Sequence, residues 1–548
     1  MTASFHSSTL RSVRGDPGST RSRWIRLAIL GWIAIPVVLT VRVFCDSQSG
    51  RGFDRPRGPG DTPRMTRLVG HQPAPQNGVR TQSCSTSNCH GSLAADIRED
   101  AVRTDEYFVW LDDPHARAYR TLFGERSRAI FQRLGVTDDQ LRPLAGRAER
   151  FHAVWTNCLA CHETNSHLSM LSAKTSLSAE VVTHPALSAA EGVSCESCHG
   201  DARDWLHRHS SSDRADWKAL GHDGQRDLGY ISGSNVAAHA KRCATCHVGS
   251  TVGDVNHDLI AAGHPALRFE YVWYLSRLPQ HWKPGRRAAI ERNLGQSAGQ
   301  DHAMGSADPT RDWLIGQLVT AIAALEQLER RAGDATPHGS WPEFAEYNCS
   351  ACHHELNGNS WRLERGIPGL AAVGPARSRL AVPWGNWNLE LIPIMADQFG
   401  SPSSQEVSTA FGRLRDSFHE RPVPANPAVI SRSKVAREKL ETWLTEVSKL
   451  SDGDAARMLQ QLGRSHPERL IASWDQTATV LLGFAALHRS AQHIPEPLQT
   501  AMNRVRLPEA PLVIDSPRDF RSGRDPQSLT SDQWIELLKQ LADLAPEQ

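Results

Sequence analysis

Cysteines and histidines at a repeated spacing are the residues of this chain best suited to chemistry. Ten of the 11 cysteines form five pairs, and a histidine directly follows the second cysteine of every pair. The five motifs, numbered in chain order, are Cys84/Cys89 with His90, Cys158/Cys161 with His162, Cys195/Cys198 with His199, Cys243/Cys246 with His247, and Cys349/Cys352 with His353. Four are C-x-x-C-H, the signature of covalent haem attachment, whereas the first has four residues between its cysteines.

This spacing suits a porphyrin. Two thiols separated by two residues lie about one helical turn apart on one face, so both can bond to the vinyl groups along one porphyrin edge. The four residues between Cys84 and Cys89 require a bulged loop, but the same two bonds remain possible. The adjacent imidazole is then directed at the iron as an axial ligand. The pattern therefore predicts five covalently attached haem c groups.

Zinc sites and disulfides also use paired cysteines. A zinc site needs four ligands in a tetrahedron, and disulfides form in exported proteins. Neither a zinc site nor a disulfide explains why a histidine follows the second cysteine of each pair. Haem attachment is therefore the preferred interpretation.

A second set of histidines is needed if the irons carry imidazole on both faces. Of the 25 histidines, five belong to the motifs, and context favours four others as distal ligands. His115 follows Asp-Asp-Pro, and His209 ends the stretch WLHRH shortly after the third motif. His257 and His264 stand seven apart, so a helix would place both on one face. Methionine ligation is a weaker alternative because the chain has only seven methionines.

The N-terminal segment carries the only long apolar run, residues 27–45. It is uninterrupted for 15 residues before Arg42, and several arginines precede it. This is short for a spanning helix and suits a signal segment or a marginal anchor. No clear cleavage site follows, so residues 1–45 are expected to stay attached as a membrane anchor. Because haem is attached outside the cytoplasm, the chain after residue 45 is expected on the extracytoplasmic side.

The remaining chain divides into three predicted parts. Residues 46–80 are rich in glycine and proline and form a flexible tether, 81–365 hold the five motifs, and 366–548 contain a loop followed by a helical region without haem. Helical periodicity occurs over 314–328, with Gly333 as a stop, and over 428–450 and 468–488. No stretch shows sustained strand alternation. The predicted fold class is mainly α with extensive loops, a multihaem cytochrome c haem-packing fold plus a helical C-terminal region.

Several stretches resemble the multihaem cytochromes of the cytochrome c-554 family over roughly residues 82–362. They are SCSTSNCHGS, DPHARAY, EGVSCESCHGDARDWLHRH, DVNHDLIAAGHPALRFE and CSACHHEL. The resemblance implies closely stacked porphyrins, mostly bis-histidine iron and electron transfer. It also supports the four distal ligands named above and favours His184 as a fifth, with His354 as its main rival. The best-known member of that family is tetrahaem, so its properties are not transferred to the fifth motif or to residues 390–548.

An electron carrier is the predicted function. Imidazole on both faces of an iron blocks access of substrate, and no catalytic residue is predicted. The partners are expected to be other redox proteins or a membrane quinol system. The 61 basic and 60 acidic residues nearly cancel, which gives no reason to expect nucleic acid.

An oxidoreductase that acts on a small nitrogen or sulfur compound at one five-coordinate haem is the alternative. Related multihaem enzymes mark their catalytic haem with an unusual ligand, such as lysine in place of the motif histidine. All five motifs of this chain keep histidine. This favours the carrier over the enzyme.

Overall fold

The computed structural model describes the greater part of the chain after residue 80. The described residues are 81–87, 89–91, 106–136, 149–164, 192–210, 214–279, 309–334, 341–349, 353, 384–420, 426–488, 494–505, 507 and 530–544. Contacts divide the chain into Met1–Gln72 and Pro73–Gln548, and every described residue belongs to the second unit. The predicted anchor, the tether and most of the predicted loop at 366–386 lie outside the described residues.

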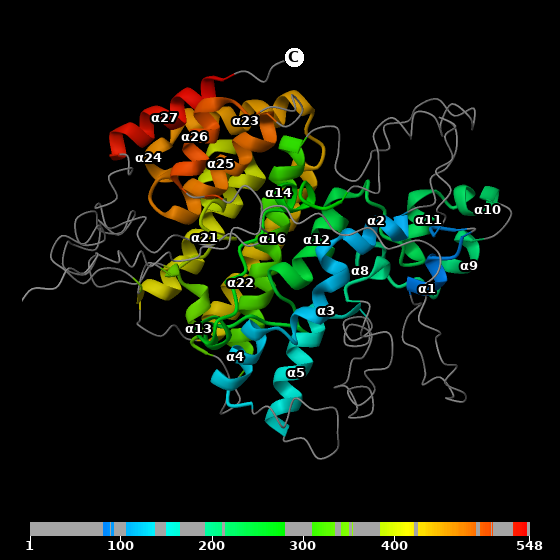
Figure 1. The fold of residues 1–548 in the computed structure, drawn as a ribbon. Coiled ribbons are helices and arrows are strands. Elements are labelled where there is room, and N and C mark those ends of the chain that lie inside the picture. The colour runs from blue at the N-terminus through cyan, green and yellow to red at the C-terminus, as the bar shows by residue number, and fades with distance from the viewer. Residues whose placement is uncertain are drawn as a thin grey trace, which may run out of the picture. The chain divides into compact units, whose positions relative to one another are not determined.

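The described residues are mainly helical (Figure 1), which confirms the predicted fold class. The helices are α1 Thr81–Cys84, α2 Glu106–Asp112, η1 Pro114–Arg117, α3 Ala118–Thr121, α4 Glu125–Arg133, α5 Glu149–His162, α8 Cys195–His199, α9 Leu206–His209, α10 Arg214–Ala219, α11 Gly221–Asp227, α12 Val236–His247, α13 His257–Ala262, α14 Tyr271–Leu275, α16 Pro309–Gly333, η4 Phe344–Glu346, α20 Ile392–Phe399, α21 Pro402–Glu420, α22 Asn426–Val447, α23 Asp452–Ser465, α24 Pro467–Leu470, α25 Trp474–His488, α26 Glu496–Arg504 and α27 Ser531–Asp543. The β pairing found in these ranges is an isolated antiparallel bridge between Tyr347 and Trp384. In the same ranges, no helix combines the length and the apolar character that crossing a lipid bilayer requires.

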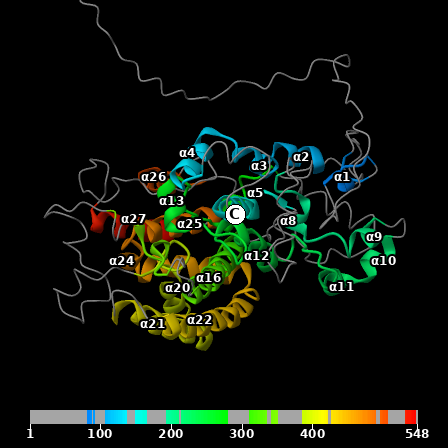
Figure 2. The ribbon, with the colours of Figure 1, turned by 90° about the horizontal axis from the view of Figure 1, so that it is seen from below.

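Helix α16 is the longest described helix and is buried on nearly all sides. It contacts α12, α14, α22 and α25, and Trp313, Leu318 and Leu325 along it have no exposed surface. A helix that is apolar around its whole circumference is stable only when other elements enclose it. Helices α12 and α22 lie on opposite sides of α16 (Figure 2). The predictions of a helix over 314–328 and of its end at Gly333 are confirmed.

One apolar core joins the fourth haem motif to the C-terminal helices. Ala240 and Ala244 of α12, which ends in that motif, belong to the same buried cluster as Leu440 of α22 and Leu481 of α25. Helix α16 belongs to the predicted motif-bearing part, residues 81–365, but it packs against helices of the predicted C-terminal part, residues 366–548. The C-terminal helices thus fix the position of α12 through α16.

The bounds of the C-terminal helices differ in part from the ranges that the sequence periodicity predicts. Helix α22 covers most of the predicted helix 428–450. The predicted single helix over 468–488 is wrong, because α24 ends at Leu470 and α25 begins at Trp474. The backbone N–H of Gln476 donates to Oγ of Ser473 at 3.0 Å, so a serine cap starts the second helix.

A core substitution tests this packing. Leu440→Ala in α22 removes a side chain with no exposed surface at the contact with α16, and we expect it to lower the free energy of unfolding by about 2–5 kcal/mol. Val435→Ala in the same helix is the control, because Val435 is 43% exposed. Urea unfolding followed by circular dichroism measures both. Equal midpoints for the two variants would contradict the proposed packing.

Candidate haem sites

The cysteine motifs lie on or beside short helical segments. The second and fourth motifs end α5 and α12, the third forms α8, and the first begins at the end of α1. Of the fifth motif the structure describes Cys349 and His353, and Cys352 lies outside the described residues. In the second, third and fourth motifs the helix brings both cysteines to one face, with the histidine directly after them.

The first motif differs from this arrangement, because its second cysteine is not helical. Helix α1 ends at Cys84, and Cys89 lies in a turn whose backbone N–H donates to the carbonyl oxygen of Thr86 at 2.9 Å. The backbone N–H of His90 donates back to the carbonyl oxygen of Cys84 at 3.0 Å, which closes the loop. Placement of two thiols on one helix face therefore does not apply to Cys84 and Cys89. Cys89 is half-buried in this loop, and its bond to haem stays a prediction.

Two of the motif cysteines are neutral thiols. Burial raises the pKa of Cys158 to about 12 and that of Cys198 to about 11, so both stay protonated at neutral pH. None of the nine described cysteines takes part in a disulfide. Across the part of the chain that the structure describes, no group of three or more His, Cys, Asp or Glu side chains is placed to hold a metal ion.

Three motif histidines each face a histidine that the sequence predicts as a distal ligand. The ring centroids lie 6.1 Å apart for His90 and His209, 6.0 Å for His247 and His115, and 6.3 Å for His353 and His257. A metal–imidazole bond is about 2 Å long and the ring centre lies about 1 Å further on, so two imidazoles across one metal ion have centres roughly 6 Å apart. All three pairs therefore fit an iron held from both sides.

Carbonyl oxygens fix the tautomer of three further imidazoles. The Nδ1 atoms of His162, His199 and His264 lie 2.9, 3.3 and 2.8 Å from the carbonyl oxygens of Ala118, Ile231 and Pro265, respectively. A carbonyl oxygen only accepts hydrogen bonds, so in each case Nδ1 carries the proton and Nε2 keeps its lone pair. Haem-ligating histidines need this arrangement, because the second hydrogen bond orients the ring and strengthens the metal-binding nitrogen.

Carboxylates hold two of the facing imidazoles. Oε2 of Glu106 lies 3.1 Å from Nδ1 of His90. Oδ1 of Asp113 lies 2.9 Å from Nδ1 of His115 and also accepts a hydrogen bond from the backbone N–H of His115 at 2.9 Å. Sequence reasoning missed both acids. The Asp-Pro-His order could have revealed Asp113, because an aspartate before a proline often bonds to backbone N–H groups two residues on.

His257 and His264 do not share one helix face, because the helix that would place them so ends before His264. Helix α13 begins at His257 and ends at Ala262, and Gly263 follows with a φ of +116°, in the left-handed region that favours glycine. The turn separates the two imidazoles. His257 faces His353, whereas burial and the charge of His162 lower the pKa of His264, which places His264 near the second motif.

The structure does not describe the residue predicted as the fifth distal ligand. His184 and its rival His354 both lie outside the described residues. Each stays a prediction.

Motifs that are distant in the sequence lie side by side. A hydrogen bond between the thiols of Cys84 and Cys195, together with burial, raises the pKa of Cys195, so the first and third motifs are in contact. The thiols of Cys161 and Cys246 make the same contact between the second and fourth motifs. Helix α1 packs against α8, and α5 against α12, in agreement with these two contacts.

An arginine joins the third and fourth motifs. Arg242 precedes Cys243 in α12, and its Nε donates to the carbonyl oxygen of Ser197 in α8 at 2.7 Å. Its Nη2 donates to the carbonyl oxygen of Glu196 at 3.2 Å. The third and fourth motifs are therefore fixed to each other by side chain and backbone.

A buried ion-pair network ties the second motif to the fifth. Arg331 of α16 is 6% exposed and donates to Glu346 and to Asp254, each at 2.6 Å. Asn157, next to Cys158, exchanges two hydrogen bonds with the backbone of Asp254, at 2.7 and 2.8 Å. Burial opposes ionisation of Asp254, but the charges of Arg331 and Arg330 outweigh it and lower the pKa of Asp254. Glu346 precedes the fifth motif, so one guanidinium links the two motifs.

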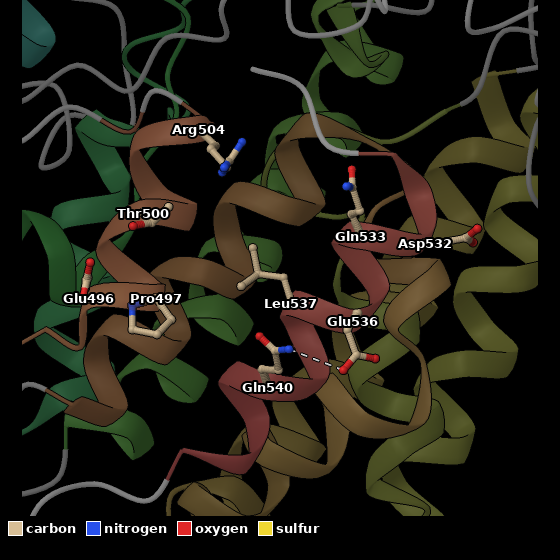
Figure 3. Close-up of a pocket in the computed structure, with 9 residues that line it drawn as sticks. All are labelled: Glu496, Pro497, Thr500, Arg504, Asp532, Gln533, Glu536, Leu537 and Gln540. Carbon is tan, nitrogen blue, oxygen red and sulfur yellow. Dashed lines mark hydrogen bonds between the residues drawn. The ribbon is translucent and has the colours of Figure 1, made fainter. Parts of the chain in front are cut away.

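A hollow between α26 and α27 lies apart from these histidines. Figure 3 shows that its lining comes from the two helices, and Nε2 of Gln540 donates to Oε1 of Glu536 there at 3.4 Å. The lining residues are Glu496, Pro497, Thr500, Arg504, Asp532, Gln533, Glu536, Leu537 and Gln540. None is a cysteine or histidine, so this hollow supplies no haem ligand.

Residues 83–200 match a family model described as cytochrome c554 and c-prime. The matched residues include the first three motifs, so this part of the chain is similar to the c-type cytochromes of the cytochrome c554 family. Proteins of this class hold haem c through covalent bonds, transfer electrons and are generally extracytoplasmic. No curated protein and no solved structure matches the chain.

Removal of the central guanidinium tests the ion-pair network. We expect Arg331→Gln to lower the free energy of unfolding at pH 7 by about 3–5 kcal/mol, because Asp254 and Glu346 would stay buried without their shared cation. Arg469→Gln is the control, since Arg469 and Asp397 form a half-exposed pair worth at most about 1 kcal/mol. Denaturant unfolding compares the two variants, and a similar loss in both would contradict a special role for Arg331.

The same network predicts a pH dependence. In the wild type the lowered pKa of Asp254 gives stability that is complete above the ordinary carboxyl pKa and is lost as pH falls through the lowered value. In Arg331→Gln, Glu346, whose pKa burial already raises, loses the cation that opposes this shift, and Asp254 keeps only Arg330 as its cation. Protonation of these carboxyls at mildly acidic pH therefore restores part of the stability that the variant has lost. The stability gap between the two proteins should narrow from about pH 7 to about pH 5. A constant or widening gap in unfolding experiments would rule this explanation out.

Proposed function

We propose that this chain carries five covalently attached haems and transfers electrons outside the cytoplasm through mostly bis-histidine irons. The observation that carries the proposal is the set of three facing imidazole pairs with ring centroids 6.0–6.3 Å apart. Each pair combines a motif histidine with a histidine far away in the sequence. An iron held between the two rings would account for each of these pairs.

The side chains of this protein would hold and insulate the haems. Bound haem supplies one-electron chemistry at its iron. Imidazoles on both faces keep substrates and water away from that iron, and the carbonyl and carboxylate bonds to Nδ1 hold each ring in its orientation. Arginine and carboxylate groups between the motifs fix the spacing of neighbouring sites. This arrangement favours electron passage over binding of a substrate.

The contacts between motifs support a definite order of the haems. The first motif touches the third, the third is bonded to the fourth, the fourth touches the second, and the second is tied to the fifth. We propose that electrons follow this order, one, three, four, two, five, or its reverse. The first and fifth haems are then the two ends of the path.

Partners and location follow from this path. We propose that other redox proteins or a membrane quinol system exchange electrons at the two terminal haems. Residues 27–45 would hold the protein at the membrane, with the haem-binding part on the periplasm-like side. These assignments rest on the sequence and on the extracytoplasmic attachment of haem c.

Ligand replacement tests the bis-histidine assignment. We expect His209→Ala to convert one low-spin haem to a high-spin haem in the electron paramagnetic resonance (EPR) spectrum of the oxidised holoprotein, because the first iron loses its second imidazole. His207→Ala is the matched control, since His207 lies on the same short helix and is exposed. The intact mass and the pyridine haemochrome spectrum should both give five haems in each protein.

Two outcomes would overturn the proposal. A mass short of five covalent haems would remove the pentahaem assignment. A high-spin haem in the wild type that binds nitric oxide or hydroxylamine would favour the alternative, an oxidoreductase acting on a small nitrogen or sulfur compound.

A further inference from the structure

The three facing imidazole pairs differ in the angle between their ring planes. The planes of His90 and His209 are 5° apart, and those of His257 and His353 are 24° apart. The planes of His115 and His247 are 85° apart, almost perpendicular. The distances between centroids are nearly equal, so the pairs differ in orientation and not in separation.

Ring orientation decides the electronic state of a low-spin ferric iron. Each imidazole donates π electrons into the iron d orbital perpendicular to its own plane. Parallel rings act on one and the same orbital and split it from its partner, whereas crossed rings act on two orbitals equally and leave them close in energy. The first case gives a rhombic EPR spectrum with three resolved features. The second gives a strongly anisotropic spectrum dominated by one feature at low field.

The orientation of His115 is fixed by Asp113. One carboxylate oxygen, Oδ1, lies 2.9 Å from the ring Nδ1 and accepts from the backbone N–H of the same histidine, also at 2.9 Å. Asp113 is 8% exposed, so water offers little competition for these bonds. A side chain bonded to both the backbone and the ring of one residue leaves that ring little rotational freedom.

The orientation of His247 is fixed by aromatic packing. The ring of Phe269 lies against it with centroids 4.9 Å apart and planes 22° apart, and the ring of Tyr274 meets it edge-on at 5.3 Å. The hydroxyl of Tyr274 donates to the carbonyl oxygen of Arg268 at 2.9 Å, which holds that ring in place. Phe269 is 3% exposed. Close packing of this kind permits one ring orientation.

We propose that the haem of the fourth motif has crossed axial imidazoles and is electronically distinct from the haems of the first and fifth motifs. Asp113 and Phe269 are the positioning residues that impose this difference. The inference rests on the bis-histidine ligation proposed above and adds to it the orientation of each pair. In the proposed order the fourth haem is the central one, so the path has a distinct site in its middle.

EPR difference spectra of the oxidised holoprotein test the proposal. Subtracting the spectrum of His115→Met from that of the wild type should leave the strongly anisotropic low-field signal of one haem. The same subtraction with His209→Met should leave a rhombic signal, which makes His209→Met the matched control. Intact mass checks that all haems remain attached in both variants.

Three results separate the possible failures. A rhombic difference for His115→Met, or a strongly anisotropic one for His209→Met, overturns the orientation proposal and leaves bis-histidine ligation standing. A wild type in which these haems are already high-spin overturns the ligation itself.

The positioning role is tested by variants that keep both ligands. Asp113→Ala and Phe269→Leu should shift the anisotropic signal toward the rhombic type, because one ring can then rotate. Glu106→Ala, which changes the hydrogen bond at the first pair, should leave that signal unchanged. An anisotropic signal that persists unaltered in both Asp113→Ala and Phe269→Leu overturns the positioning role.

Discussion

Two imidazoles must face each other across a gap of about 6 Å if they are to share one metal ion, and three pairs of histidine rings in this fold lie at that separation. The partners come from different parts of the chain, such as His90 with His209 and His115 with His247. No helix or turn can bring them together alone. The long-range packing of this protein therefore brings these distant rings together.

The scaffold that holds the rings combines an apolar core with a few buried charges. Helix α16 belongs to the core that encloses α12, and Arg331 on the same helix bonds to Asp254 and Glu346. Buried ion pairs often add little net stability, because each charge loses its hydration. Their bonds have definite directions, however, so they set positions that apolar packing alone would leave less defined. The C-terminal helices thus pack against the segments that carry the fourth motif, although they contain no motif themselves.

The sequence identified the candidate haem-binding cysteines and histidines more fully than it identified which histidines lie opposite each other. Cysteine spacing revealed the motifs, and local context selected His115, His209 and His257, each of which faces a motif histidine in the structure. Which ring meets which could not be predicted, because tertiary contacts between distant segments leave no local pattern. The same limit applies to Arg331, which looks in the sequence like any basic residue near a helix end.

Local signals explain the two differences between the predicted and the observed helices. Periodicity joined α24 and α25, although Ser473 caps the second helix. The spacing of His257 and His264 suited one helix face, but Gly263 lies between them in a left-handed conformation and ends the helix.

If the chain is exported from its N-terminus, as proposed above, the order in which the paired histidines emerge differs from site to site. His115 would leave the membrane before the fourth motif, so that site would acquire both imidazoles as soon as His247 follows. The first site would have to wait for His209, which follows the second and third motifs in the chain. Maturation would then finish the first-emerging site late, and a chain arrested between residues 90 and 209 would carry a haem with one open face exposed to oxidants.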